Sequence, residues 1–353
     1  GLGHNVFESI TSADENVAVG SQALKATTSG GGNIAIGKDS LIANTTGNTN
    51  IAIGTDAMTT NVAGDRNVAV GEQALQNMNP SGNVDTYNVG IGYNAGLSIT
   101  TGTANAFIGG RAGDATTTGS TNTAVGTDAL SSNTTASNNV AVGYDCLVSN
   151  TSGTQNTAVG AGALDANTTA ANNSAFGYNA LGANTTGANN VGIGQFSLDA
   201  NTTGDANTAL GHNALTGNTT ASKNTAVGKD ALAVNTTGTE NVAVGEVALD
   251  ANTTGNYNTA VGRHALSSNT TASSNTAVGR NALGDNTGAT NTAVGTDALG
   301  SNSTASDNTA VGRKALFSNT TGTSNVAVGE TAMLLNVSGN QNTAVGRESL
   351  SAN

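Results

Sequence analysis

A repeat of 17 residues runs through the chain and limits what it can fold into. One copy, residues 224–240, reads NTAVGKDALAVNTTGTE, and we number its positions 1 to 17 from Asn224. Position 1 is Asn and position 5 is Gly in all twenty copies. A unit this short cannot bury a hydrophobic face alone, so its stability must come from stacking on its neighbours. The repeat therefore predicts a solenoid rather than a globular domain.

The first residues of each repeat predict a β-strand. Position 4 is Val or Ile in eighteen of the twenty copies, position 2 is nearly always Val, Ile or Thr, and position 3 is usually Ala. β-Branched residues at alternate positions are typical of strands, and apolar residues on both faces are typical of parallel sheets covered on two sides. We expect Val227→Asp to disturb the stack and Lys229→Ala to be nearly silent.

A second short apolar segment occupies positions 8 and 9, after a tight turn at Gly. The polar sequence NTTG or NTTA then leads to the next strand. A helical repeat is excluded because the apolar segments are short, bounded by Gly and rich in Val and Thr. We expect an all-β parallel β-solenoid or β-roll with two short strands per turn and about twenty rungs. The structural positions of one repeat are Asn224, Val227, Gly228, Ala231, Leu232 and Asn235.

The Asn residues at positions 1 and 12 are expected to stack amide on amide at the spacing of the strands. Position 12 runs from Asn44 to Asn353, and the N-T-T triplet that begins there is also a sequon for N-glycosylation. We interpret the triplet as structural, because the ladder and the turn chemistry account for it.

Composition and charge exclude several functions. The 353 residues include 48 Gly, one Pro and no Trp, so a thick core cannot form. The net charge of -12 comes from scattered Asp and Glu, which argues against nucleic-acid binding. No run of about 18 apolar residues is present, so we expect no insertion into a membrane. Cys146, the single cysteine, takes the place of Ala at position 8, and we interpret it as a small buried residue.

No motif in the sequence predicts chemistry. The three His residues, His4, His212 and His264, lie in separate repeats, away from any metal-ligand spacing. Nothing in the sequence positions a Ser-His-Asp arrangement, and no phosphate loop is followed by its lysine. We therefore predict that the protein is not an enzyme and uses no metal or cofactor.

We expect a single repeat array over residues 1–353, with regular rungs in 1–75 and 122–353 and irregular rungs in 76–121. Four extra residues follow Gly71, in a segment that contains the only proline, and one residue is lost within 284–290. Solenoid ends normally carry protective caps, and neither end of this sequence resembles one. We therefore expect either a segment of a longer fibre or ends that dock against other subunits.

The irregular rungs are also the most aromatic part of the chain. Two interpretations stay open: a packing irregularity that is compensated locally, or a receptor-contact loop of the kind that insertions in solenoids form. Under the second interpretation the candidate contacts are Pro80, Tyr87, Tyr93, Phe107 and Arg111.

The sequence NTAVGxxAL, at residues 156–164 and 308–316, resembles the repeats of two groups of proteins. NIAIG at 33–37 is similar to the repeat core in the β-roll head of YadA-like trimeric autotransporter adhesins. LSSNTTA at 130–136 and 266–272 is similar to the repeat shaft of trimeric tail-fibre proteins of phages and bacteria, which is the closer match.

This resemblance implies a left-handed homotrimer that works outside the cell, as a rigid shaft or head of a virion tail fibre or a bacterial surface adhesin. Its partners would be copies of itself and a host surface glycan or protein. The small apolar content of one rung also favours apolar columns shared between chains. Two alternatives stay open: a purely structural spacer, and an ice-binding β-solenoid in which stacked Thr at positions 2, 13 and 14 form a regular array.

Overall fold

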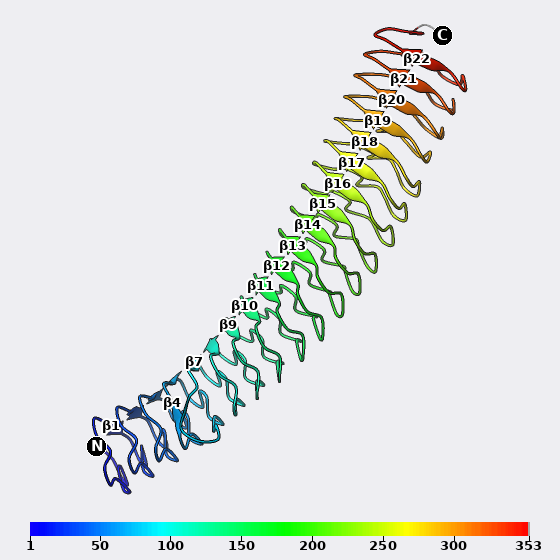
Figure 1. Cartoon of the computed structure of the whole chain (residues 1–353). Coiled ribbons are helices and arrows are strands. Elements are labelled where there is room, and N and C mark those ends of the chain that lie inside the picture. Colours follow the sequence, from blue (N-terminus) through cyan, green and yellow to red (C-terminus); the bar gives the residue numbers. More distant parts are fainter. Residues whose placement is uncertain (352–353) are drawn as a thin grey trace. The chain divides into compact units, whose positions relative to one another are not determined.

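The computed structural model describes residues 1–351 and is an all-β parallel β-solenoid of about 19 turns with a period of about 17 residues. The expected fold class and period are confirmed. The chain divides into two compact units, Gly1–Asn173 and Ser174–Asn353, and each is described by itself. Within each unit, successive turns stack on one another (Figure 1).

In the first unit each turn contributes one three-residue strand, which pairs in parallel with the strand of the next turn. The register is one repeat throughout, so equivalent positions lie directly above one another. In sheet order the strands are β1 (Val17–Val19), β2 (Ile34–Ile36), β3 (Ile51–Ile53), β5 (Val68–Val70), β7 (Val89–Ile91), β8 (Ala106–Ile108), β9 (Thr123–Val125), β10 (Val140–Val142) and β11 (Thr157–Val159). A separate parallel pair, β4 (Gly64–Asp65) and β6 (Val84–Asp85), joins the preceding turn to the end of the inserted segment.

The second unit follows the same plan, with parallel pairing in the same register. Its strands are β12 (Ser174–Phe176), β13 (Val191–Ile193), β14 (Thr208–Leu210), β15 (Thr225–Val227), β16 (Val242–Val244), β17 (Thr259–Val261), β18 (Thr276–Val278), β19 (Thr292–Val294), β20 (Thr309–Val311), β21 (Val326–Val328) and β22 (Thr343–Val345).

The expectation of a second strand per turn is wrong. In the repeat at 224–240, Asp230 and Leu232 have φ angles of 55° and 52°, which are left-handed and incompatible with an extended strand. The segment still joins neighbouring turns through its backbone. The N–H of Asp230 donates to the carbonyl of His212 in the preceding turn, and the N–H of Leu232 donates to the carbonyl of Ala248 in the following turn, both at 3.0 Å.

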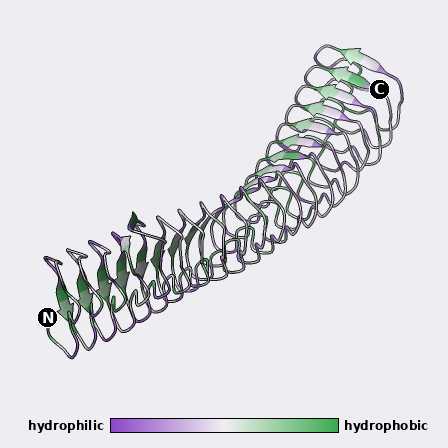
Figure 2. Cartoon of the chain, turned by 60° about the horizontal axis from the view of Figure 1, so that its bottom comes forward, coloured by the Kyte–Doolittle hydropathy of each residue, from purple (hydrophilic) through white to green (hydrophobic). Residues whose placement is uncertain are grey.

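The interior of the coil is narrow and filled by small residues and leucine. Ala226 of β15 is completely buried, as are Ala231 and Leu232 from the turn segment. Thr225 and Val227 lie on the other face of β15 and are half-buried. Position 3 therefore faces the interior, whereas positions 2 and 4 face outward. The hydrophobic colour follows the strands in each unit, and the loops carry a mixture of hydrophobic and hydrophilic colour (Figure 2).

The invariant Gly at position 5 has a steric cause. Gly228 has a φ of +132°, and a Cβ atom added there would lie 2.6 Å from the carbonyl oxygen of Gly245 in the next turn. Only glycine combines this conformation with so close an approach of two backbones. The same contact recurs at other position-5 glycines within each unit, so the requirement follows from the stacking itself.

The buried Asn residues form the ladders that the sequence suggests. The Nδ2 of Asn224 donates to the carbonyl of Gly238 at 2.8 Å, and its Oδ1 accepts the backbone N–H of Asn241 in the next turn at 2.9 Å. The Nδ2 of Asn235 donates to the same Gly238 carbonyl at 2.9 Å and to the Oδ1 of Asn218 at 3.0 Å. These bonds fix the corners of each turn from inside. Asn353, the last expected member, lies outside the described residues.

The lost residue within 284–290 interrupts one of these ladders. The buried Oδ1 of Asn269 has no hydrogen-bond partner among residues 1–351, because the next position-12 residue, Asn286, bonds elsewhere. The position-1 ladder continues past the deletion, where the N–H of Asn291 donates to the Oδ1 of Asn275 at 2.9 Å. The deletion therefore shortens the outer corner of the turn without breaking the sheet.

Candidate functional site

The outer face of the strand ladder is an apolar surface that no part of the described chain covers. At position 4, Ile36 and Ile91 of the first unit are each 38% exposed, and Leu210 and Val311 of the second are 44% and 37% exposed. Because the strands pair in register, these side chains form a continuous column within each unit. Apolar columns of this kind commonly mark an interaction surface.

The irregular rungs contain a rearranged core rather than an exposed aromatic patch. Phe107 takes the inward-facing Ala position of β8 and is completely buried. A Cβ atom at Gly113 would lie 2.5 Å from the Phe107 ring, and one at Gly96 would lie 2.8 Å from it. The two glycines, which replace position-9 Leu, thus provide the space for the ring. Burial removes Phe107 from the candidate receptor contacts.

Pro80 is also buried and therefore is not available as a contact. Its ring packs against Gly64, where an added Cβ would lie 2.9 Å from the Pro80 Cγ. Nearby, Met78 occupies a position that Asn holds in most other turns, and it is completely buried. The inserted segment is therefore anchored by apolar packing at its start.

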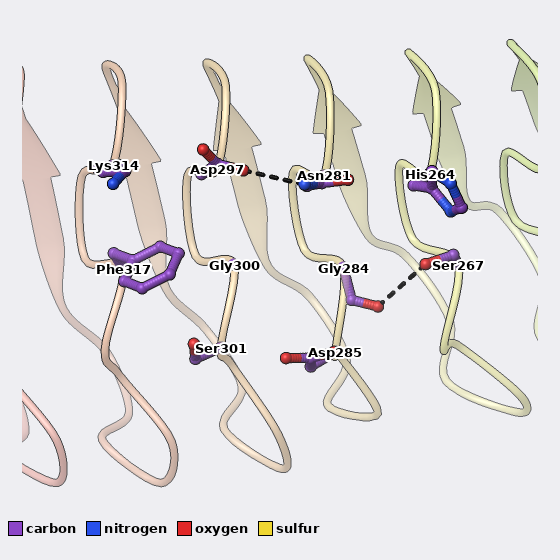
Figure 3. A pocket seen from close by; sticks show the side chains of 10 residues that line it. All are labelled: His264, Ser267, Asn281, Gly284, Asp285, Asp297, Gly300, Ser301, Lys314 and Phe317. Atoms are coloured by element: carbon purple, nitrogen blue, oxygen red, sulfur yellow. Dashed lines mark hydrogen bonds between the residues drawn. The ribbon is translucent and has the colours of Figure 1, made fainter.

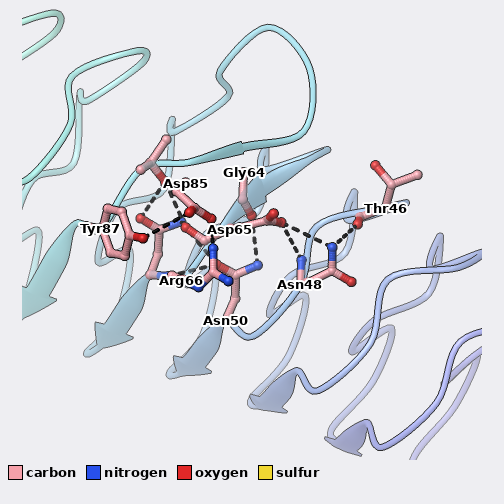
Figure 4. A network of polar contacts seen from close by, with 10 residues as sticks. Thr46, Asn48, Asn50, Gly64, Asp65, Arg66, Asp85 and Tyr87 are labelled. Carbon is pink, nitrogen blue, oxygen red and sulfur yellow. Dashed lines mark hydrogen bonds and ion pairs between the residues drawn. The ribbon is translucent and has the colours of Figure 1, made fainter.

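A polar network holds the end of the insertion (Figure 4). Arg66 forms an ion pair with Asp85, and the Tyr87 hydroxyl donates to the other oxygen of that carboxylate at 2.9 Å. The guanidinium of Arg66 lies 6.0 Å from the centre of the Tyr87 ring. On the opposite side, the Asp65 carboxylate accepts the backbone N–H of Asn48 at 2.6 Å. These contacts explain how the extra residues are accommodated without disrupting the neighbouring turns.

Three of the sequence-predicted contacts are at the surface. Tyr87 and Tyr93 are each 53% exposed. Arg111 is also exposed, and its guanidinium donates two hydrogen bonds of 2.5 Å to Asp128 in the next turn. These hydrogen bonds raise the pKa of Arg111 and lower the pKa of Asp128. The five predicted contacts therefore do not converge on a single surface site.

A groove of about 410 Å³ lies in the second unit beside the one-residue deletion. Its floor is formed by Gly284 and Gly300, which both occupy position 10 and so leave two successive turns without a side chain there. Figure 3 shows Phe317, the next position-10 residue, at one end of this floor and Ser267 at the other. The remaining lining residues are His264, Asn281, Asp285, Asp297, Ser301 and Lys314.

Some polar side chains in the walls of this groove form hydrogen bonds or ion pairs with other residues of the chain, and others do not. Asn281 donates to Asp297 at 3.1 Å, and Asp297 also pairs with Arg280 at 3.6 Å. Within residues 1–351, the side chains of Asp285 and His264 make no hydrogen bond or ion pair. The groove thus offers an acceptor at Asp285 and an imidazole at His264, which lies at the end opposite the Phe317 ring (Figure 3).

Lys314 is exceptional among the cations of this protein. Each of the other ten Lys and Arg side chains has a carboxylate oxygen within 3.6 Å. Lys314 has none among residues 1–351, and its Nζ lies 5.5 Å from the centre of the Phe317 ring, within the range of a cation–π contact. An unpaired cation is notable in a chain with a net charge of -12.

No family model and no curated protein matches this chain.

Other candidate chemistry is limited. Residues 1–351 contain no cluster of three or more His, Cys, Asp or Glu side chains that could bind a metal ion. In the same range, no helix is long and apolar enough to cross a membrane. Cys146 is buried, and burial raises the pKa of its thiol to about 12, so the reactive thiolate is strongly disfavoured.

The groove was not among the sites suggested by the sequence. A signal for it exists, because Gly284 and Gly300 are consecutive position-10 residues and Phe317 follows at the same position one turn later. Aligning the repeats by position would have placed these three residues side by side. That Lys314 is unpaired could not be deduced in the same way, because pairing depends on side-chain conformations.

Proposed function

We propose that this chain is a segment of an extracellular attachment fibre, a left-handed homotrimeric shaft or head of a virion tail fibre or bacterial adhesin. The observation that carries the proposal is the apolar column at position 4, which no part of the described chain covers. The solenoid itself does not need this column to be apolar, because Ala226, Ala231 and Leu232 already fill the interior of their turn. An apolar residue retained at an outward-facing position of every turn is best explained by a partner.

A second copy of the chain is the partner that fits this surface. The column repeats once per turn, so a surface can contact it along its length only if it has the same period. Another copy has that period and the same apolar side chains. The number of copies, three, and the left-handed coil come from the resemblance to trimeric adhesins and tail fibres. Burying the column in the trimer would leave the loops and the groove accessible to a host surface.

The test is the mass of the purified protein in solution, by light scattering or sedimentation. We expect three times the chain mass of 34.3 kDa. The variant Val227→Asp/Val261→Asp, changed in alternate turns of the outer face, is expected to shift the mass to that of one chain while the β-sheet circular dichroism is kept. The matched control Thr237→Asp/Thr271→Asp places the same charges at exposed loop positions and is expected to remain trimeric. A monomeric parent protein would overturn the proposal.

One observation favours ice binding as a second candidate. Thr259, Thr276, Thr292 and Thr309 occupy position 2 in four successive turns of the second unit and face outward in register. Such a column presents hydroxyl and methyl groups at a regular spacing. Thermal hysteresis of a monomeric protein would support this function, and burial of the same face in a trimer would exclude it.

The remaining alternative is a spacer without receptor contact. A trimer that binds neither cells nor glycans would support that function.

A further inference from the structure

The groove over Gly284 has features that the repeat alone does not produce. Position 10 carries a side chain in most turns. Gly284 and Gly300, at this position in two successive turns, open a space with the volume of an ordinary small-molecule site. Gly284 does not have a left-handed φ, and a Cβ atom added there would come no closer than 3.4 Å to another atom. The backbone at Gly284 therefore does not require glycine, and the absence of a side chain creates the groove.

The Phe317 ring closes one end of the groove. It extends over Gly300, where an added Cβ would lie 2.8 Å from its Cε2 atom. The ring is only half-buried, so part of it faces the groove and solvent (Figure 3). An aromatic face carries a partial negative charge and attracts weakly positive C–H groups, such as those on one side of a pyranose ring.

The polar groups in the groove match a ligand that both donates and accepts hydrogen bonds. Lys314 supplies donors, Asp285 supplies acceptors, and Ser301 supplies both. The charges of Asp297 and Arg280 cancel in an ion pair, in which the Arg280 Nη2 lies 3.6 Å from the Asp297 Oδ2. Lys314 and Asp285 also carry opposite charges. The groove is thus close to neutral, and the net charge of -12 on the chain disfavours an anionic ligand.

We propose that this groove binds a short neutral saccharide, with one sugar ring against Phe317 beside Lys314 and the hydroxyl groups of a following ring on Asp285. This inference rests on the attachment role proposed above, and it names the class of surface molecule that the fibre recognises. The loss of one residue within 284–290 distinguishes this corner from those of the regular turns.

The experiment uses an array of neutral oligosaccharides with glucose, galactose and mannose units, beside sialylated and uronic-acid oligosaccharides. We expect the full-length protein to bind members of the neutral set. Phe317→Ala removes the wall of the groove, and Gly284→Leu fills its floor. Each is expected to weaken binding at least about tenfold, as the loss of one aromatic contact or of the site would.

The matched control is Ala233→Leu, which adds the same side chain at position 10 of a regular turn and is expected to bind like the parent. Equal melting temperatures of Gly284→Leu and Ala233→Leu would show that the effect is not misfolding.

Binding only to acidic oligosaccharides, no binding, or binding unchanged in both groove variants would overturn the proposal. Mass measurements separate the two proposals, because groove variants should stay trimeric. A trimer without saccharide binding contradicts only the groove, whereas a monomer that binds saccharide contradicts only the assembly.

Discussion

Leu232 shows how a residue with an unfavourable backbone conformation is kept in this fold. Its φ of 52° is left-handed, which costs an ordinary residue about 1–2 kcal/mol. Complete burial of a leucine side chain stabilises the folded state by about 1.5–3 kcal/mol, which offsets that cost. Sequence patterns indicated that position 9 is apolar. They could not reveal its left-handed backbone, because leucine rarely adopts one, and for this reason a second strand was expected there.

The sequence left open whether position 3 or position 4 faces the interior of the coil. Val227 is the larger and more apolar residue, yet the completely buried side chain of β15 is that of Ala226. Leu232 and the Asn residues at positions 1 and 12 are also completely buried and share the interior with Ala226. The expected effect of Val227→Asp therefore moves from the stability of a single chain to its assembly.

Asp250 provides a pH-dependent prediction at the scale of one residue. Its position-10 carboxyl is half-buried, burial raises its pKa, and its buried Oδ1 has no hydrogen-bond partner among residues 1–351. The folded state therefore binds the proton more tightly than the unfolded state, so stability falls as pH rises through the folded pKa. We expect Asp250→Asn to raise the melting temperature at pH 7 and to leave it nearly unchanged at pH 3.

The control for this measurement is Asp285→Asn, which changes an exposed carboxylate in the same unit. It is expected to have little effect on the melting temperature at either pH. A melting temperature of Asp250→Asn equal to that of the parent protein at pH 7 would contradict the role assigned to burial.

At the scale of one element, β8 and its neighbours show compensation between turns. Gly96, Phe107 and Gly113 lie in the rungs that the sequence predicted to be irregular, but only the structure shows that the Phe107 ring fills the space left by both missing leucines. We expect Phe107→Ala to destabilise the protein by about 3–5 kcal/mol, because it leaves a cavity inside the coil. Denaturant unfolding measures this change.

The reciprocal test uses Gly113→Leu, alone and combined with Phe107→Ala. Alone, the leucine would collide with the ring, since its Cβ would lie 2.5 Å from Phe107. The backbone there has a φ of 58°, which matches the 57° of Leu130 in the next turn, so the conformation itself is no obstacle. We expect the double variant to be more stable than either single variant. Additive effects in this cycle would mean that the two sites do not interact.

At the scale of the whole molecule, the period was enough to predict a parallel solenoid, because every turn meets the same surface above and below. The expected single array over residues 1–353 stays a prediction.

We expect removal of one whole repeat, residues 224–240, to lower the melting temperature by only a few degrees, because the new neighbours have matching positions. Removal of residues 224–231 takes away one strand and one Asn corner, and it is expected to cause a much larger loss. Similar melting temperatures for the two deletions would contradict the nearest-neighbour stacking.

The backbone contact between Gly228 and Gly245 recurs from turn to turn, so a junction between any two turns has the same steric requirement. This affects how the gene can change in length. Unequal recombination between repeated segments of the gene would add or remove complete turns. In each product the new junction would again bring two position-5 glycines into contact. Length would then vary in discrete steps while the fold persists. A lineage could thus change the number of stacked turns without inventing any new structure.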